Sequence, residues 1–352
     1  MLVDARTGSV ANRIDDVLDV LAVEIAAHVS PETHACVAEL KTAPHSRVAG
    51  VAEELAALRS SLDGVLHDQL GLRAAAAGTH PLAVRSEVAV TSDSRYRRVA
   101  ATMGALASRE PTMALHVHVA VPDGATGVRA LDGLRDDLPL VLALSANSPF
   151  WRGSDSGFAS ARTPIFSMFP RVGIPRPFST YARYVEAVER MLCSVAVPDP
   201  TFLWWDARLQ PRFGTLEVRI MDAQSRLADA AALTALVQCL VRWRADVPQR
   251  SATEPEVLAE NRFLAARDGM RAVLIGGRTG RVRACDALAQ RLENCRPYAA
   301  ALDCQAELES VAALAADAGE ARQRRFAARD GIEGLVARLA DDFAAAHRTV
   351  AV

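Results

Sequence analysis

Two short strand-like runs carry side chains that could do chemistry. In residues 215–222, an acid and an arginine stand two positions apart between aliphatic residues. Side chains alternate between the two faces of a strand, so Glu217 and Arg219 share one face while the aliphatic residues share the other. The run LHVHVAV does the same with His116 and His118. A carboxylate beside a guanidinium could hold a metal ion and a phosphate, so the two runs predict a polar site on one face of a sheet.

Each pair also has a structural interpretation. Two histidines on one strand face suit metal binding or proton transfer, but they could equally be hydrogen-bonded residues of an ordinary sheet. Glu217 and Arg219 are either part of a binding site or a structural ion pair. Glu39, in the strand-like segment 35–42, is a lone acid and carries little weight alone.

Arginines and aromatic residues gather in two further segments. Residues 147–179 are rich in Gly, Ser, Pro and Arg, show little periodicity, and contain Asn147 and Arg162. A loop of this length inside a compact domain is often functional. The segment LWWDARLQPRFGT contains Trp205 and Arg208. Loop arginines near a carboxylate strand favour an anionic ligand such as nucleotide phosphates; the alternatives are a solvated arginine-rich surface and, for the tryptophans, a place in the core.

The composition is that of a globular protein. Half of the 352 residues are hydrophobic and 23% are charged, and the net charge of -2 gives no electrostatic reason to expect nucleic acid as a partner. Lys41 is the one lysine among 40 basic residues, so arginine, backbone N–H groups or a metal must hold any phosphate. The six cysteines form no CxxC pair, which favours free thiols in a reducing compartment. No apolar run reaches the ~18 residues of a membrane span and no secretory signal is recognisable, so we expect a cytoplasmic protein without membrane contact.

The order of the predicted elements favours an α+β fold. Strands and helices are mixed without the regular spacing of a doubly wound fold, which favours a mostly antiparallel sheet. The chain is expected to form a single domain over residues 1–352, with a helical C-terminal part at 280–352 that packs on the back of the sheet or on a partner. Helices are expected at residues 11–28, 48–70, 93–108, 125–146, 179–196, 226–247 and in much of 254–347, and strands at 1–5, 35–42, 115–121, 215–222 and in the alanine run before Gly78.

Several segments, taken together, resemble the carboxylate–amine ligases of the bacterial glutamate–cysteine ligase type 2 family. In chain order they are LHVHVAVPDG, LRDDLPLVLALSANSPFWRGSDSGFASARTPIFSMFPRVGIP, DPTFLWWDARLQPRFGTLEVRIMDAQSR and ENRFLAARDGM. The shorter segments AAGTHPLA and SRYRR agree with the same family upstream. The resemblance runs from about residue 35 to about residue 275.

The resemblance implies a fold similar to the catalytic domain of glutamine synthetase: a curved, mostly antiparallel sheet with helices on its outer face and the site on its concave face. It implies an ATP-dependent reaction in which a substrate carboxylate attacks the γ-phosphate and an amine then displaces phosphate from the acyl phosphate. Magnesium (Mg2+) ions would bridge the phosphates. The implied partners are small-molecule carboxylate and amine substrates, glutamate and cysteine by the family's name, and a homo-oligomer is compatible with the resemblance.

The resemblance also implies roles for particular residues. The metal contacts it implies are Glu39, His116 and Glu217, and the residues implied to hold phosphate or a substrate carboxylate beside Glu217 are Arg162 and Arg219. Magnesium prefers oxygen ligands, so a histidine could instead bind phosphate. The residues implied to contact ATP or to shape its pocket are His116, His118, Asn147, Trp205 and Arg208. Asn261 and Arg267 match the later motif without an assigned role.

The sequence departs from the family at its start. Family members open the sheet with a strand resembling Gly-Val-Glu-Glu-Glu-Phe-Met-Leu-Val-Asp, whose glutamates bind metal, whereas this sequence starts with MLVD. Two interpretations stay open: the first strand is truncated here and the native protein is a ligase, or the chain is a catalytically degenerate homologue that binds a ligand or a partner. Lys41, two residues after Glu39 on the same strand face, could partly neutralise that acid.

Overall fold

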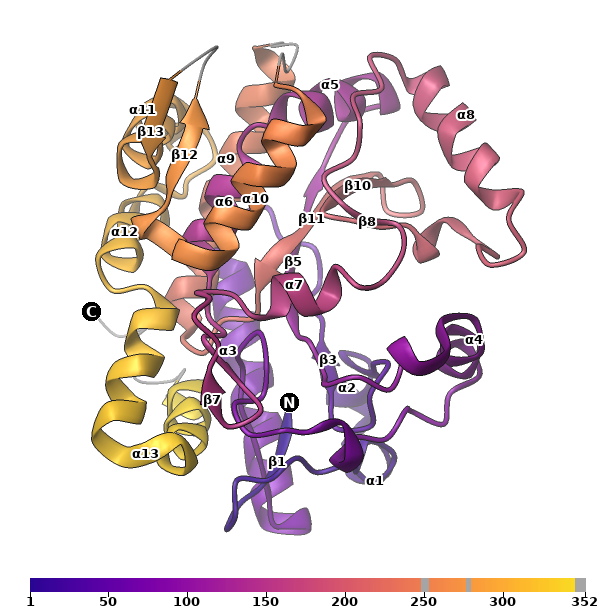
Figure 1. Cartoon of the computed structure of the whole chain (residues 1–352), viewed down its shortest axis with the longest axis vertical. Coiled ribbons are helices and arrows are strands. Elements are labelled where there is room, and N and C mark those ends of the chain that lie inside the picture. Colours follow the sequence, from indigo (N-terminus) through magenta and orange to yellow (C-terminus); the bar gives the residue numbers. More distant parts are fainter. Residues whose placement is uncertain (248–252, 277–279, 346–352) are drawn as a thin grey trace.

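The computed structural model describes residues 1–247, 253–276 and 280–345, and shows helices and short strands mixed along the chain (Figure 1). The α-helices are α1 (Ile14–Val20), α2 (Val23–Ala26), α3 (Val48–Val65), α4 (Ser94–Met103), α5 (Gly124–Leu134), α6 (Leu138–Ser145), α7 (Arg162–Phe166), α8 (Tyr181–Leu192), α9 (Leu227–Asp246), α10 (Pro255–Asp268), α11 (Ala284–Ala301), α12 (Gln305–Ala316) and α13 (Gly319–Ala344). The strands are β1 (Leu2–Asp4), β2 (Val29–Pro31), β3 (Ala38–Leu40), β4 (Leu72–Ala74), β5 (Ala114–Ala120), β6 (Phe150–Trp151), β7 (Ser154–Asp155), β8 (Val172–Gly173), β9 (Trp204–Trp205), β10 (Ala207–Gln210), β11 (Thr215–Asp222), β12 (Val273–Gly276) and β13 (Gly280–Arg283).

The strands form several small sheets, of which the largest has three strands in the order β10–β11–β5. Both pairings in this sheet are antiparallel, as are the pairs β1–β4, β2–β3, β6–β7 and β12–β13, whereas β8 and β9 run parallel. The α+β class and the mostly antiparallel pairing predicted from the sequence are therefore confirmed. The sheet is divided into short pieces.

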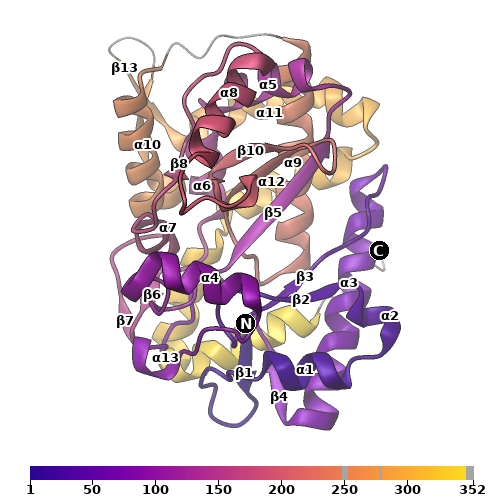
Figure 2. The ribbon, with the colours of Figure 1, turned by 90° about the vertical axis from the view of Figure 1, so that its right-hand side faces the viewer.

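Helices cover one face of the three-stranded sheet. The aliphatic side chains of β11, such as Leu216 and Val218, are fully buried in the main core together with residues of α5, α6 and α9. All eight residues of α6 are buried, as expected for a helix that is apolar all round. Figure 2 shows β5 and β10 in front of α9 and α12, with α8 above and α4 below the uncovered side of the sheet.

The N-terminal third and the C-terminal helix lie next to each other. Strand β1 pairs with β4, and side chains of α13 such as Val336 and Leu339 pack in one cluster with Val3 and Ala77. In Figure 1, α13 lies beside α3 and β1 in the lower part of the molecule. The C-terminal helix α13 therefore packs against β1 and the residues that follow β4, which lie far from it in sequence.

Five local expectations differ from the structure. The helix expected at 11–28 is divided into α1 and α2, because Leu21 between them is extended. The helix expected at 125–146 is split into α5 and α6, because Pro139, in the first turn of α6, has no N–H with which to continue the hydrogen bonds of α5. The irregular segment 147–179 contains α7 and the β6–β7 hairpin. The strand expected in the alanine run lies earlier, at β4. The helical part expected from 280 opens with β13, and its last positions, 346–352, lie outside the described residues.

Within the described ranges, the helices are all too short or too polar to cross a membrane.

Candidate active site

The three-stranded sheet gathers the predicted pairs around Glu217. In the strand register, Glu217 lies opposite His118 of β5 on one side and opposite Arg208 of β10 on the other. Its side chain is almost completely buried, with 2% of its surface exposed. Side chains directly opposite each other in antiparallel strands lie close together. The strand pattern therefore builds a charged cluster on the face that the helices leave uncovered.

Two guanidinium groups hold the Glu217 carboxylate. Arg208 donates from Nε to Oε2 at 2.8 Å, and Arg219 donates from Nη1 to Oε1. Burial alone would raise the pKa of Glu217, but the charges of Arg219 and Arg208 outweigh burial and lower the pKa to about 2. Glu217 is therefore a carboxylate at neutral pH.

The two arginines are not equivalent. Arg208 is also anchored to the main chain, because its Nη1 donates to the carbonyl oxygens of Leu203 at 2.7 Å and Thr201 at 3.0 Å. Arg219 makes no such main-chain contact among the hydrogen bonds of the described residues, and 15% of its side chain is exposed. Arg208 therefore helps to hold the fold together, whereas the partly exposed Arg219 is placed to contact a ligand.

Both histidines lie beside the same carboxylate oxygen. His116 Nδ1 is 3.8 Å and His118 Nε2 is 3.7 Å from Glu217 Oε1. Burial and the charge of Arg219 lower the pKa of His116 well below its usual range, and burial is also the main cause that lowers the pKa of His118. Neutral imidazoles can bind a metal or a phosphate oxygen without adding positive charge.

The β2–β3 hairpin brings two further acids near this cluster. Glu39 lies on β3, where Ser30 donates to its Oε2 at 2.9 Å and Lys41 Nζ lies 3.9 Å from the same oxygen. Burial raises the pKa of Glu32, and the charge of Glu39 raises it further, while that of Arg219 lowers it. Glu32 was missed in the sequence, because it directly follows β2 and comes near Glu39 only through the pairing of β2 with β3.

The acids of this cluster are residues of a type that binds magnesium, but the described side chains are not arranged as a metal site. In the part of the chain that is described, no three acidic, histidine or cysteine side chains lie close enough to form a ready-made metal site, and both oxygens of Glu217 are hydrogen-bonded to arginine. Carboxylate oxygens are nevertheless the ligands that magnesium prefers. The mutual repulsion of Glu32 and Glu39 would be relieved by a cation between them. Glu39, Glu32 and Glu217, with His116, are thus the residues that could hold the ion.

Arg162 and Asn147 are buried beneath the sheet end rather than placed in the Glu217 cluster. Arg162 donates to the carbonyl oxygens of Arg219 and Ile220. Asn147 is 1% exposed, donates from Nδ2 to Ala223 O, and accepts at Oδ1 from Gln323. The structure therefore gives both side chains protein partners.

The other residues of the implied set have structural surroundings. Trp205 packs in an aromatic cluster with Phe178, at 5.6 Å between ring centroids, and with Tyr184 at 6.3 Å. Asn261 holds the backbone of Ile275, donating to its carbonyl and accepting from its N–H. Arg267 pairs with its neighbour Asp268. Asn261 thereby gains a role that the sequence did not suggest, since it fixes β12 to α10.

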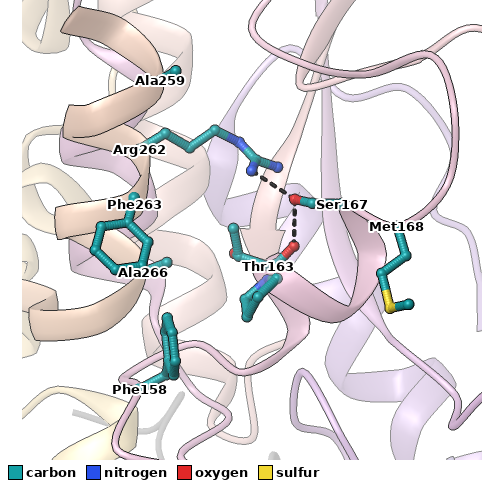
Figure 3. A pocket seen from close by; sticks show the side chains of 9 residues that line it. Phe158, Thr163, Ser167, Met168, Ala259, Arg262, Phe263 and Ala266 are labelled. Carbon is teal, nitrogen blue, oxygen red and sulfur yellow. Dashed lines mark hydrogen bonds between the residues drawn. The ribbon is translucent and has the colours of Figure 1, made fainter. Parts of the chain in front are cut away.

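A hollow of about 260 Å³ lies on the other side of α7, between α7 and α10. Figure 3 shows Arg262 and Ser167 directed toward each other here, and Arg262 Nη1 donates to Ser167 Oγ at 2.8 Å. Arg262 also forms an ion pair with Asp206 at 2.7 Å. Most of its lining belongs to the motif segments, but it includes none of the residues to which the resemblance assigns a role. We therefore take the Glu217 cluster as the candidate site.

Comparisons with known proteins agree on one family. A family model described as glutamate-cysteine ligase family 2 matches residues 3–342. A Rubrobacter xylanophilus protein with the provisional name glutamate–cysteine ligase 2-1 is 38% identical over 94% of this chain and 89% of its own length. A Gloeobacter violaceus protein with the provisional name glutamate–cysteine ligase 2 is 34% identical over 97% of this chain and 93% of its own length.

A solved structure supports the fold. The glutamate–cysteine ligase of Francisella tularensis, crystallised in complex with AMP, superposes with a TM-score of 0.69 at 12% sequence identity, covering 98% of this chain and 87% of that one. At this identity the likeness concerns the fold.

Proposed function

The chain belongs to glutamate-cysteine ligase family 2, and we propose that it is an ATP-dependent carboxylate–amine ligase acting on an amino-acid-like carboxylate and a small amine. The names of its relatives support a ligase of glutamate–cysteine type, and the AMP complex of the fold neighbour supports a nucleotide substrate. The single observation that carries the proposal is the buried Glu217, hydrogen-bonded to two guanidiniums and flanked by two histidines on one sheet face.

The proposed reaction has two steps. A carboxylate oxygen of the first substrate attacks the γ-phosphorus of ATP, the bond to the bridging oxygen breaks, and ADP leaves. The nitrogen of the amine then attacks the acyl carbon, the bond to the phosphate oxygen breaks, and inorganic phosphate leaves as the amine loses a proton. Positioning and charge stabilisation are the main tasks of a protein that catalyses phosphoryl transfer.

The described residues fit these tasks. Arg219 would bind the transferred phosphate or the substrate carboxylate, since its guanidinium can form two parallel hydrogen bonds with either. Glu217, Glu39 and Glu32, with His116, would hold magnesium, which when bound neutralises charge on the phosphates. His118, with neutral imidazole nitrogen near Glu217, would orient the nucleotide. Arg208 would keep Glu217 ionised and in place.

The test is an assay of ADP release with ATP, magnesium, glutamate and cysteine, followed by a panel of other carboxylates and amines. We expect ADP release that requires a carboxylate, and a hydroxamate when hydroxylamine replaces the amine, because hydroxylamine traps an acyl phosphate. Glu217→Gln should abolish the signal, whereas Glu309→Gln, a matched change at an exposed position of α12, should not.

ATP binding without turnover of any pair would overturn the proposal and favour the noncatalytic ligand-binding alternative. An equal loss in the two variants would remove Glu217 from the mechanism. Circular dichroism of both variants separates these results from misfolding.

A further inference from the structure

Strand β11 contains an irregularity at Arg219, the residue proposed to bind phosphate or the substrate carboxylate. Val218 pairs with Val117 and Met221 pairs with Leu115, so two residues of β11 lie opposite the single residue His116. This two-against-one arrangement is a β-bulge, which bends a strand and re-aims its side chains. The two residues of β11 at the bulge are Arg219 and Ile220.

Arg162 supplies hydrogen-bond donors to the carbonyl groups of this bulge. Strand β10 begins at Ala207, opposite Val218, and just before it Asp206 O accepts from the N–H of Arg219 at 2.8 Å. Arg162 donates from Nη2 to Arg219 O at 3.2 Å and from Nη1 to Ile220 O at 3.0 Å. Its side chain is 7% exposed. A planar guanidinium can satisfy two carbonyl groups at once, which an ammonium group does less well.

Asp222, the last residue of β11, lies close to Arg162 and binds the segment that precedes it. Asp222 is completely buried, and its carboxylate accepts from the backbone N–H of Asn147 at 2.9 Å, from Ser148 Oγ at 2.6 Å and from Ser160 Oγ at 2.9 Å. It also lies 3.8 Å from Arg162 Nη1. A buried carboxylate with this many donors is held rigidly, because every departure leaves polar groups unpaired.

We propose that Arg162 and Asp222 are positioning residues that hold the bulge, and thereby aim the Arg219 side chain at Glu217 and His116. This differs from the substrate contact that the family resemblance implies for Arg162. The geometry carries the proposal: the guanidinium of Arg162 is directed at the backbone of Arg219, and the Arg219 guanidinium reaches Glu217 and lies 3.4 Å from His116 Nδ1. Its consequence for catalysis rests on the proposed function.

The geometry can be tested without any activity. The N–H of Arg219 donates to Asp206 O at 2.8 Å, so its hydrogen exchange reports whether the bulge is held. In Arg162→Lys and Asp222→Asn, we expect exchange of the peptide covering residues 215–222 to be about tenfold faster or more, because local opening becomes easier.

Arg59→Lys is the matched control. Arg59 is equally buried and also donates to two consecutive carbonyl groups, Gln224 O at 2.9 Å and Ser225 O at 2.8 Å, but these lie outside the bulge. We expect its variant to leave exchange of the peptide 215–222 unchanged. Unchanged exchange in both Arg162→Lys and Asp222→Asn would overturn the proposal, and so would an equal increase in Arg59→Lys. If Arg162→Lys does not fold, Asp222→Asn carries the test.

Kinetics then separate positioning from substrate contact. Arg162→Lys should lower kcat by about 100-fold, the cost of a misplacement near 1 Å, and adding it to Arg219→Lys should cost less than about threefold more, because both changes act through one side chain. Additive losses, or a rise in the KM of one substrate with unchanged exchange, would show a substrate contact instead. A wild-type protein without ligase activity would sink the proposed function, while the exchange result would still decide the geometry.

Discussion

Two acids on the same strand, five residues apart, have opposite surroundings. Glu217 is surrounded by cations: two arginines bind it directly, and its pKa falls to about 2. Asp222 is more deeply buried and is held mainly by hydroxyl and N–H groups; burial raises its pKa, although Arg162 opposes this. The difference assigns Glu217 to the proposed reaction and Asp222 to the support of the strand. The carboxylate held by two arginines lies on the face that the helices leave uncovered, where an anionic substrate could bind Arg219, and the one with mainly neutral donors anchors the strand.

The largest expected effect is on kcat, which should fall much more for a change at Glu217 than for a change at Asp222. Glu217→Gln should lower kcat by about 100- to 1000-fold, as the loss of a preorganised charge in an active site does. Asp222→Asn should lower it by only about tenfold, since it leaves in place Arg162, which contacts the bulge directly. Steady-state rates of ADP release measure both, and equal losses would contradict the assignment of separate roles.

The pH dependence of stability should have opposite signs for the two acids. The pKa of Glu217 falls from its ordinary value of 4.5 to about 2 on folding, so its ionised form contributes on the order of 3 kcal/mol above pH 4.5, and this is lost as the pH falls toward 2. Asp222 has a raised pKa in the folded state, so its contribution becomes less favourable as the pH rises above the ordinary value.

Urea unfolding at several pH values measures this difference. Glu217→Gln should remove part of the acid sensitivity of the wild type. Asp222→Asn should become less destabilising, relative to the wild type, as the pH rises from acid to neutral. Parallel pH profiles of the two variants would show that the two surroundings do not differ as described.

Removing the Asp222 carboxylate tests how much its buried hydrogen bonds contribute to stability. Asp222→Ala should lower the free energy of unfolding by about 2 to 3 kcal/mol, because the two serine hydroxyls and the Asn147 N–H lose their acceptor and the buried Arg162 loses its ion-pair partner. Asp286→Ala, which removes an acid from an exposed pair with Arg283, should cost less than about 1 kcal/mol. Equal costs, measured by urea unfolding, would mean that the Asp222 network relaxes without loss.

The smallest effect concerns the two arginines of Glu217. Arg208→Lys should lower the free energy of unfolding by about 1 to 2 kcal/mol, because hydrogen bonds to two main-chain carbonyls are lost or weakened. Arg219→Lys should cost less stability but more activity. If thermal unfolding and ADP release rank the two variants in the reverse order, Arg208 is the residue that meets the substrate.

The sequence could predict which side chains share a strand face, but not every strand that pairs beside them. The two-residue alternation in residues 215–222 and 115–121 placed Glu217, Arg219, His116 and His118 together, and the register confirms that these strands pair. Arg208 opposite Glu217 depends on the pairing of β10 with β11, which no local pattern specifies. Glu32 was missed for the same reason, since its neighbour Glu39 belongs to another strand.

The support of the site depends on contacts between distant parts of the chain. Gln323 holds Asn147 across 176 positions of sequence, and Arg162 reaches β11 from a segment that showed no periodicity. The antiparallel α+β class followed from the mixture of elements and from the family motif. Side-chain alternation encodes neither its division into short sheets nor the bulge at Arg219.

The most direct test of the central claim follows an oxygen atom. The protein is incubated with ATP, magnesium, cysteine and glutamate carrying 18O in its carboxylates, and the released phosphate is analysed by mass spectrometry. Transfer of one 18O into each phosphate is the predicted result, because the substrate oxygen that attacks the γ-phosphorus leaves with it. ADP release with unlabelled phosphate would contradict a carboxylate–amine ligase, since the phosphate would then have been transferred to water.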